Sequence, residues 1–460
     1  MGNFFPNYPI PLFTPDSRPY VKDNCPRQGK TLALWYLIKP TMEQALPTAK
    51  HPIPATTRPD PSDGPRPADL GARPASAGRL LFIDNIRWVM ILLVLSMHAA
   101  VTYSGHGSWY VKEPAKLGLA QDLTFLTYQV FLQSFFMGFL FFIAGYFVPA
   151  AYDKKGPGRF IKDRAVRLGL PALFFMLVIQ PLTLYYAAGL WDTDQGFWRN
   201  YQHYILHGRV LSGSGPLWFC IALLFFCLVY AGFRRTTGAT LPSWRRPASA
   251  TAVKPTSFPR GGIIIGFIAV ITIATFLVRI PWPNGTSFYN MQFCYFSQYV
   301  AFFIAGTMAY RHSWLSTLSA TTSKRWGYIG FFGGLAIWFT LIALNIHAKT
   351  FAPFDGGWHW QSLSMCLLES LAGTGISLGL LGLFRERFNR QGRWALFFSA
   401  SAFAVYVFHT PVLIVITRLL TDLHWLPLLK FLLATILAIV ATYILSAFVF
   451  RRIPLLKNIL

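Results

Sequence analysis

The chain has 460 residues, of which 54% are hydrophobic and only 13% are charged, and its mean hydropathy is +0.42. Soluble domains carry about 25% charged residues, so this composition excludes a water-soluble enzyme. The 41 Lys and Arg residues outnumber the 17 Asp and Glu residues, which gives a formal net charge of +24. These cations lie between apolar runs and not along one stripe or arm, which favours a membrane protein over a nucleic-acid-binding protein.

The first 78 residues differ from the rest of the chain in composition. They are rich in Pro, Ala, Thr and Arg, and runs such as residues 51–61 cannot build a hydrophobic core. The one apolar run, residues 31–38, is far shorter than the roughly 20 residues that cross a bilayer as a helix. We therefore predict a disordered cytoplasmic tail over residues 1–78 and one transmembrane domain over residues 79–460.

Ten apolar stretches follow residue 79, and each is long enough to cross a bilayer as an α-helix. They are residues 86–105, 127–150, 168–188, 216–233, 261–280, 292–310, 326–345, 360–384, 396–420 and 426–450. The predicted fold class is therefore all-α, a polytopic membrane protein with about ten transmembrane helices.

Lys and Arg residues are concentrated in alternate segments between these stretches. The segments before the third, fifth, seventh and ninth stretches and after the tenth hold 22 of them, whereas the other connecting segments hold five. Because cytoplasmic loops are enriched in Lys and Arg, this asymmetry predicts that both termini are cytoplasmic and that the number of spans is even. The five cysteines form no CxxC pair and no HExxH motif occurs, so we expect no metal site.

The first predicted span contains two ionisable residues. Charged and titratable groups inside a membrane are costly and mark functional sites. Arg87 and His98 are eleven residues apart, which corresponds to roughly 16 Å and about three helical turns, so they share one helix face. Arg87 would lie at the cytoplasmic end and His98 near mid-bilayer, which suits a long substrate with an anionic head. A snorkelling arginine and a hydrogen-bonded core histidine are the structural alternative.

This spacing resembles the pattern of an Arg, ten residues and a His on the first helix of the acyltransferase-3 family of membrane O-acyltransferases. Further segments resemble the family's motifs in the same order. They are residues 141–147 (Phe-Phe-Ile-Ala-Gly-Tyr-Phe), the Arg-x-x-Arg at 164–167, residues 215–219 (Gly-Pro-Leu-Trp-Phe) and residues 401–411, which contain Tyr406 and His409. The resemblance covers about residues 79–460 and is nearest to the glucan succinyltransferase and surface-polysaccharide acyltransferase branch.

The resemblance implies transfer of an acyl group, such as acetyl or succinyl, from cytoplasmic acyl-CoA to a hydroxyl of a carbohydrate-like acceptor at the outer face. His98 is then the expected general base, with a covalent acyl-His as the alternative route. Arg164 and Arg167 are three residues apart at the inner end of the third predicted helix, so they can face the same way and bind the phosphates of the nucleotide beside Arg87. Ordinary positive-inside topology is the alternative explanation for Arg164 and Arg167. Asp84 lies three residues before Arg87 and would orient its guanidinium, or it is an exposed carboxylate at the N-terminus of the helix.

Three further polar residues fall beyond mid-bilayer in the eighth and ninth predicted spans. Glu369, the only acid in the eighth span, would polarise an imidazole as a second catalytic group, or it is a charge-paired structural acid. Tyr406 and His409 are one turn apart and would bind the acceptor or the thioester carbonyl. A hydrogen bond between helices is the alternative for this pair.

Two other functions fit the same pattern of spans. A transporter or flippase would need no acyl chemistry but leaves the spacing of Arg87 and His98 as a coincidence, and an acyl-CoA carrier or sensor would bind without turnover. For the enzyme we expect acyl-CoA as donor substrate, a glycan or other hydroxyl acceptor, membrane lipids as partners, no nucleic acid and no permanently bound cofactor. The expected location is the plasma (inner) membrane, because surface glycans are modified on its outer side.

Overall fold

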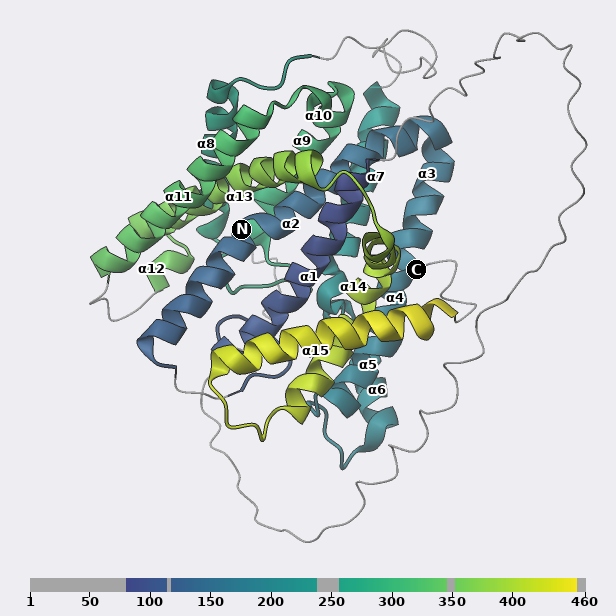
Figure 1. Cartoon of the computed structure of the whole chain (residues 1–460). Coiled ribbons are helices and arrows are strands. Elements are labelled where there is room, and N and C mark those ends of the chain that lie inside the picture. Colours follow the sequence, from purple (N-terminus) through teal and green to yellow (C-terminus); the bar gives the residue numbers. More distant parts are fainter. Residues whose placement is uncertain (1–79, 114–116, 238–255, 346–351, 453–460) are drawn as a thin grey trace, which may run out of the picture. The chain divides into compact units, whose positions relative to one another are not determined.

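The computed structural model describes residues 80–113, 117–237, 256–345 and 352–452 (Figure 1). Within these ranges the backbone is almost entirely helical, and the only β-type pairing is an isolated bridge between Phe288 and Met291. The all-α fold class is therefore confirmed. The predicted tail, residues 1–78, lies outside the described residues.

Each of the ten predicted spans corresponds to a helix or to a run of helical segments. They are α1 (Leu81–Ser104), α2 (Leu119–Lys155), the run from α3 (Pro157–Arg164) to η3 (Thr183–Ala187), α7 (Trp218–Thr237), α8 (Gly261–Arg279), α9 (Phe296–Arg311), α11 (Ala320–Asn345), α13 (Trp360–Arg387), α14 (Arg393–Leu419) and α15 (Pro427–Phe448). Nine of these segments within the described ranges have the length and hydropathy of a membrane-crossing helix. The remaining one, α9, has 16 residues, or about 24 Å of helix against about 30 Å of hydrocarbon.

The third span is not a regular α-helix. After α3 the chain passes through π-helical turns η1 (Ala165–Gly169), η2 (Phe175–Ile179) and η3, separated by the short segments α4 (Leu170–Phe174) and α5 (Gln180–Leu182). Pro171 and Pro181 lie in α4 and α5. A proline donates no backbone hydrogen bond and crowds the preceding turn, which is a cause of such widened turns. The side-chain spacing in this span therefore departs from that of an α-helix.

Glycine residues allow some of the helices to pack with their backbones in contact. A Cβ atom at Gly145 of α2 would lie 2.3 Å from the carbonyl oxygen of Phe303 in α9, and one at Gly306 would lie 2.1 Å from that of Phe142. Small residues serve this purpose in membrane helix pairs, where backbones approach closely. The Phe-Phe-Ile-Ala-Gly-Tyr-Phe motif thus contains a contact point between α2 and α9.

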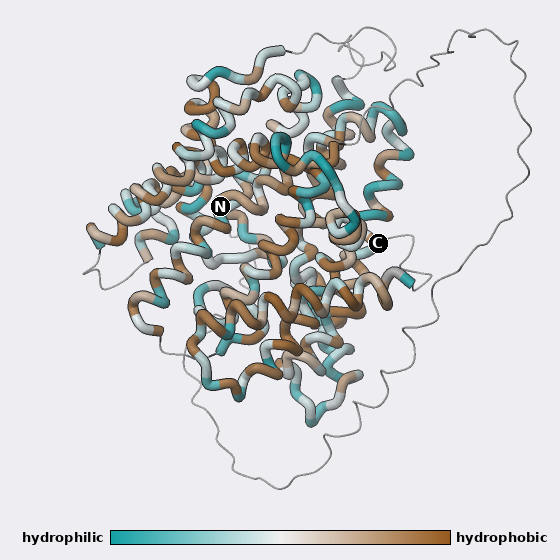
Figure 2. The backbone as a smooth tube through the Cα atoms, viewed as in Figure 1, coloured by the Kyte–Doolittle hydropathy of each residue, from teal (hydrophilic) through white to brown (hydrophobic). Residues whose placement is uncertain are grey.

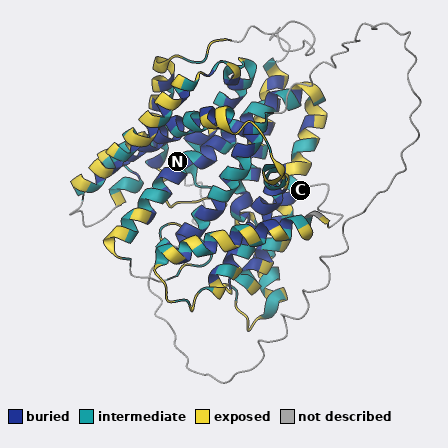
Figure 3. Ribbon diagram, in the orientation of Figure 1, coloured by how far each residue is buried: buried dark blue, intermediate teal, exposed yellow. Residues whose placement is uncertain are grey.

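Burial separates central helices from peripheral ones (Figure 3). In the most apolar window of α14, 72% of the residues are buried inside the protein, whereas the value is 28% for α8 and for α15. Most exposed residues of α8 and α15 are apolar, and Figure 2 colours much of the α15 backbone as hydrophobic. An apolar surface of this extent faces lipid and not water. The protein is therefore an integral membrane protein, with α1 packed against α2, α13, α14 and α15.

Contacts between basic residues and neighbouring helices join several helix ends. Asp153, near the end of α2, binds Arg234 at the end of α7 (3.0 Å) and Arg311 at the end of α9 (2.6 Å). Arg385, near the end of α13, donates hydrogen bonds to two carbonyl oxygens in the segment 315–318 that follows α9. We call the side of the protein on which these helix ends lie its basic end.

Candidate functional site

His98 lies on α1 and is half-buried beside two other aromatic rings. Its imidazole stacks on the indole of Trp109, with centroids 4.0 Å apart, and on the imidazole of His409, with centroids 5.4 Å apart. The interplanar angle is 12° in both pairs. Among the described residues, no group forms a hydrogen bond with the ring of His98. The ring nitrogens are therefore not engaged by another group in the described part of the chain.

The second imidazole is held in one orientation by its own helix. Nδ1 of His409 lies 2.8 Å from the carbonyl oxygen of Tyr406, one turn earlier in α14. A carbonyl oxygen only accepts hydrogen bonds, so Nδ1 carries the hydrogen and Nε2 of the neutral ring presents a lone pair. This Nε2 is buried and has no hydrogen-bond partner in the described part of the chain. The site thus contains a buried acceptor next to His98.

Tyr406 has a different arrangement from its neighbour. Its hydroxyl donates a hydrogen bond to the carbonyl oxygen of Pro216, which lies in the 3-10 turn η5 (Gly215–Leu217). This contact joins α14 to the Gly-Pro-Leu-Trp motif before α7. The structure therefore gives Tyr406 the helix-joining hydrogen bond that was its alternative explanation in the sequence.

The loop between α1 and α2 carries Trp109 to its place on His98. Gly105 ends α1 with a φ of 74°, a conformation that favours glycine. The backbone nitrogen of Glu113 donates to the carbonyl oxygen of Thr102 at 2.9 Å, and its carboxylate lies 2.7 Å from Nζ of Lys430 in α15. These contacts close the loop over the end of α1. The loop therefore holds Trp109 in a fixed position, as one wall of the site.

Tyr110, the next residue in this loop, ties it to the third span. Its hydroxyl donates to Oε1 of Gln180 at 2.6 Å. Burial raises the pKa of this hydroxyl, because a phenolate would lose its solvation, so Tyr110 stays a neutral donor. The same hydroxyl would lie 3.0 Å from a Cβ atom at Gly215, which has a φ of 48°. The glycine of the Gly-Pro-Leu-Trp motif is thus required where this loop, the third span and η5 meet.

Arg87 lies near the start of α1, on the same continuous helix as His98. Eleven residues correspond to about 20° of rotation beyond three full turns and roughly 16 Å of rise. Nη1 of Arg87 is 3.2 Å from Oδ1 of Asp84, and the guanidinium carbon is 4.6 Å from the centroid of the Phe147 ring on α2. The carboxylate and the ring both contact the guanidinium, while 41% of the Arg87 side chain remains exposed.

Asn85 supports the same end of α1, and the sequence analysis did not identify it. Its Nδ2 donates to the carbonyl oxygens of Phe388 (2.7 Å) and Arg390 (3.0 Å), in the segment between α13 and α14. This residue fixes that basic segment next to the Asp84 and Arg87 pair. The only feature of the sequence that points to Asn85 is its position between Asp84 and Arg87.

Arg164 and Arg167 do not form a pair on one helix face. The guanidinium carbon of Arg164 lies 5.3 Å from the centroid of the Phe160 ring, whereas Nε of Arg167 binds Oδ1 of Asp163 at 3.1 Å and its side chain is largely exposed. The π-helical turn η1 begins between them, and its wider turn separates side chains that are three residues apart.

Glu369 is paired with a cation that the sequence analysis did not identify. Nη2 of Arg279, at the end of α8, lies 2.7 Å from Oε2 of Glu369 in α13, and both side chains are buried. The guanidinium carbon is also 5.1 Å from the centroid of the Tyr295 ring. In the described ranges, no contact connects Glu369 with His98 or His409. The sequence signal for this pair was a lone arginine inside the fifth apolar stretch.

These features define the class of the protein. It is a helical integral membrane protein with a free imidazole inside the bundle and a guanidinium at the basic end of the same helix. A family model described as "Acyltransferase domain" matches residues 80–447, which is most of the chain. The chain belongs to this acyltransferase-3 family and is a membrane O-acyltransferase.

Curated relatives of known name are also similar over most of their length. The glucans biosynthesis protein C of Salmonella schwarzengrund (strain CVM19633) is 26% identical over 402 residues, which cover 83% of this chain and 94% of the relative. The protein of the same name from Escherichia coli O157:H7 is 25% identical over 390 residues, with the same coverage of both chains. No solved structure matches the chain.

Proposed function

We propose that this enzyme transfers an acetyl, succinyl or similar acyl group from acyl-CoA to a hydroxyl of a glycan, with His98 as the general base. The observation that carries the proposal is the ring of His98: it is half-buried, it has no hydrogen-bond partner among the described residues, and it lies on the face of α1 that carries Arg87. An ordinary core histidine would be hydrogen-bonded to a neighbouring group.

The chemistry needs one proton acceptor and one anion site. His98 removes the proton of the acceptor hydroxyl as the oxygen attacks the thioester carbonyl carbon; the C–S bond breaks, and the imidazolium returns the proton to the departing thiolate. The products are an ester and free CoA. Arg87 binds the phosphates of the donor at the basic end, and Asp84 orients its guanidinium. Arg164 and Arg167 are further candidates for contacts with the nucleotide from the third span.

The acceptor enters from the side opposite to the donor in this proposal. Trp109 and Tyr110 belong to the loop that connects the far ends of α1 and α2, and the indole of Trp109 forms a wall beside His98. Nε2 of His409 accepts a hydrogen bond from a second hydroxyl of the acceptor and so helps to orient it. For Glu369, the contact with Arg279 favours the charge-paired structural role over a catalytic one.

A carbohydrate acceptor is supported by the name of the relatives, glucans biosynthesis protein C. The basic residues of the alternate loops support a topology with both termini in the cytoplasm. In this proposed topology the donor site is inside and the acceptor site is outside. We further propose the plasma (inner) membrane as the location, because glycans at its outer side are then within reach of the enzyme.

The test is a transfer assay with the full chain in lipid nanodiscs. The protein is incubated with labelled acetyl-CoA or succinyl-CoA and glucan oligosaccharides, and ester formation is followed by mass spectrometry. The test variant is His98→Ala. Its matched control is His203→Ala, because His203 is an exposed histidine of α6 (Gly196–Leu206). We expect transfer by the wild type and by this control. Movement of intact oligosaccharide across vesicles without any ester would assign the protein to transport instead.

A further inference from the structure

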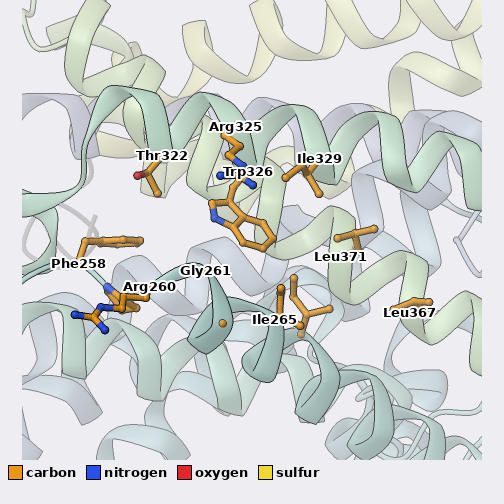
Figure 4. A pocket seen from close by; sticks show the side chains of 13 residues that line it. Phe258, Arg260, Gly261, Ile265, Thr322, Arg325, Trp326, Ile329, Leu367 and Leu371 are labelled. Atoms are coloured by element: carbon orange, nitrogen blue, oxygen red, sulfur yellow. The ribbon is translucent and has the colours of Figure 1, made fainter.

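A cavity of about 690 Å³ lies between α8, α11 and α13 (Figure 4), and neither His98 nor His409 lines it. This volume is within the range of about 300 to 1,000 Å³ typical of ligand sites. Two arginines from different helices line one part of it, Arg260 immediately before α8 and Arg325 in the first turns of α11. The other walls are apolar and include Ile265, Ile329 and Leu367.

The polar and apolar parts of the cavity are separated along the helices. Figure 4 shows Arg260 at one end of the cavity and Leu367 at the other. Along α8, Ile268 lies about 12 Å from Arg260, since each residue adds 1.5 Å of rise. Trp326 lies next to Arg325 and forms part of the wall between the two regions. The cavity therefore has a cationic end and an apolar end, which are complementary to the two parts of an amphiphilic ligand.

The two arginines have no anionic partner within the described part of the chain. Neither guanidinium forms an ion pair or a hydrogen bond there, in contrast to Lys324, whose ammonium lies 3.3 Å from Glu386. A Cβ atom at Gly262 would meet no atom within 4 Å, so the backbone at the start of α8 is open beside them. An anion can approach both arginines without displacing another group.

We propose that this cavity binds an anionic glycerophospholipid from the leaflet at the basic end. Its phosphate lies between Arg260 and Arg325, and one acyl chain lies along Ile265, Ile329 and Leu367. The leaflet at the cytoplasmic side carries anionic lipids, and each nearby Lys or Arg strengthens their binding. A free anion would leave the apolar wall uncovered, and a zwitterionic lipid would bring an additional cation to two arginines. The site is separate from the acyl-transfer site and does not depend on the proposed reaction, but it rests on the proposed topology, in which the basic end is cytoplasmic.

Native mass spectrometry of the purified, delipidated full chain tests the proposal. The probes are phosphatidylglycerol and phosphatidylcholine with identical acyl chains. We expect phosphatidylglycerol to bind preferentially, and the substitutions Arg260→Ala and Arg325→Ala each to weaken its binding about fivefold. Lys324→Ala is the matched control, because Lys324 is adjacent in sequence, bound to Glu386 and absent from the cavity wall. It should leave the preference unchanged.

A second pair of variants tests the apolar part without changing charge. Leu367→Trp fills the interior and should lower binding of phosphatidylglycerol, whereas Ile263→Trp, on the exposed surface of α8 outside the cavity, should not. Equal binding of the two lipids by the wild type would overturn the proposal. Equal losses of lipid binding in Lys324→Ala and in the arginine variants would also overturn it, as would complete displacement of the lipid by glycerol 3-phosphate. The same holds if the wild type forms a dimer that Leu367→Trp dissociates, or if lipid binds only after removal of residues 1–79.

Discussion

The imidazole rings of His98 and His409 lie parallel, with centroids 5.4 Å apart, although they come from the first and ninth of the ten spans. The backbone contact of His409 leaves its Nε2 as a hydrogen-bond acceptor, while the ring of His98 has no such constraint. Two equivalent rings are thus placed in different chemical roles by their local surroundings. One is suited to orienting a hydroxyl and the other to removing its proton.

The role of His409 can be separated from that of the base. His409→Ala removes the acceptor, and we expect the KM for the glycan to rise up to about tenfold, the value of one lost hydrogen bond, while the KM for acyl-CoA stays unchanged. His409→Gln retains a side-chain acceptor and should recover part of the affinity. Initial rates at varied concentrations of each substrate measure both constants. An unchanged KM for the glycan in His409→Ala would exclude contact with the acceptor.

Trp109 is expected to exclude water from the reacting thioester. In Trp109→Ala the wall beside His98 opens, so hydrolysis of acyl-CoA should rise relative to ester formation. The ratio of free acid to glycan ester, measured by mass spectrometry, reports this change. Trp198→Ala on the exposed surface of α6 is the control, and it should behave as the wild type. Equal ratios in both variants would show that the indole has only a packing role.

Arg87 should act on the donor and not on the acceptor. Arg87→Ala is expected to raise the KM for acyl-CoA by about tenfold or more, as for loss of a charge-assisted hydrogen bond. Arg87→Lys should recover part of this loss, because it keeps the charge without the planar fork. Arg199→Ala, on α6, provides a control that removes one positive charge elsewhere. Unchanged donor affinity in a direct acyl-CoA titration of Arg87→Ala would contradict this assignment.

The Glu369 and Arg279 pair should be structural. Glu369→Ala leaves a buried guanidinium without its partner, and we expect a loss of about 3 to 5 kcal/mol in the free energy of unfolding. Replacing both residues, with Glu369→Gln and Arg279→Met, should restore much of this stability. Thermal unfolding in detergent measures the change. A Glu369→Ala protein with unchanged Tm and no transfer activity would instead assign a catalytic role to this carboxylate.

The sequence allowed the span pattern and the shared face of α1 to be predicted, because both depend on local regularities. Apolar runs separated by basic segments define the helices, and α1 has no proline or π-turn to disturb the spacing of Arg87 and His98. The same rule failed to describe the local geometry at Arg164 and Arg167. A π-helical turn begins between these two residues, and the prolines of the third span do not indicate in the sequence where such a turn begins.

The long-range contacts were not accessible from the sequence. Trp109 reaches His98 because its loop is held by Glu113, whose partner Lys430 lies in the last span. The pairing of Arg279 with Glu369 likewise joins two helices that are distant in the chain. Apolar runs show which residues form helices but do not say which helices become neighbours.

The most direct test of the account is acyl transfer by His98→Ala, with His203→Ala as the matched control, in nanodiscs with labelled acyl-CoA and a glucan acceptor. We predict that His98→Ala has the Tm and the acyl-CoA affinity of the wild type. Its rate of ester formation should be lower by at least about 100-fold, which is the contribution of a general base. Ester formation by His98→Ala at the rate of the control would contradict the assignment of His98 as the base.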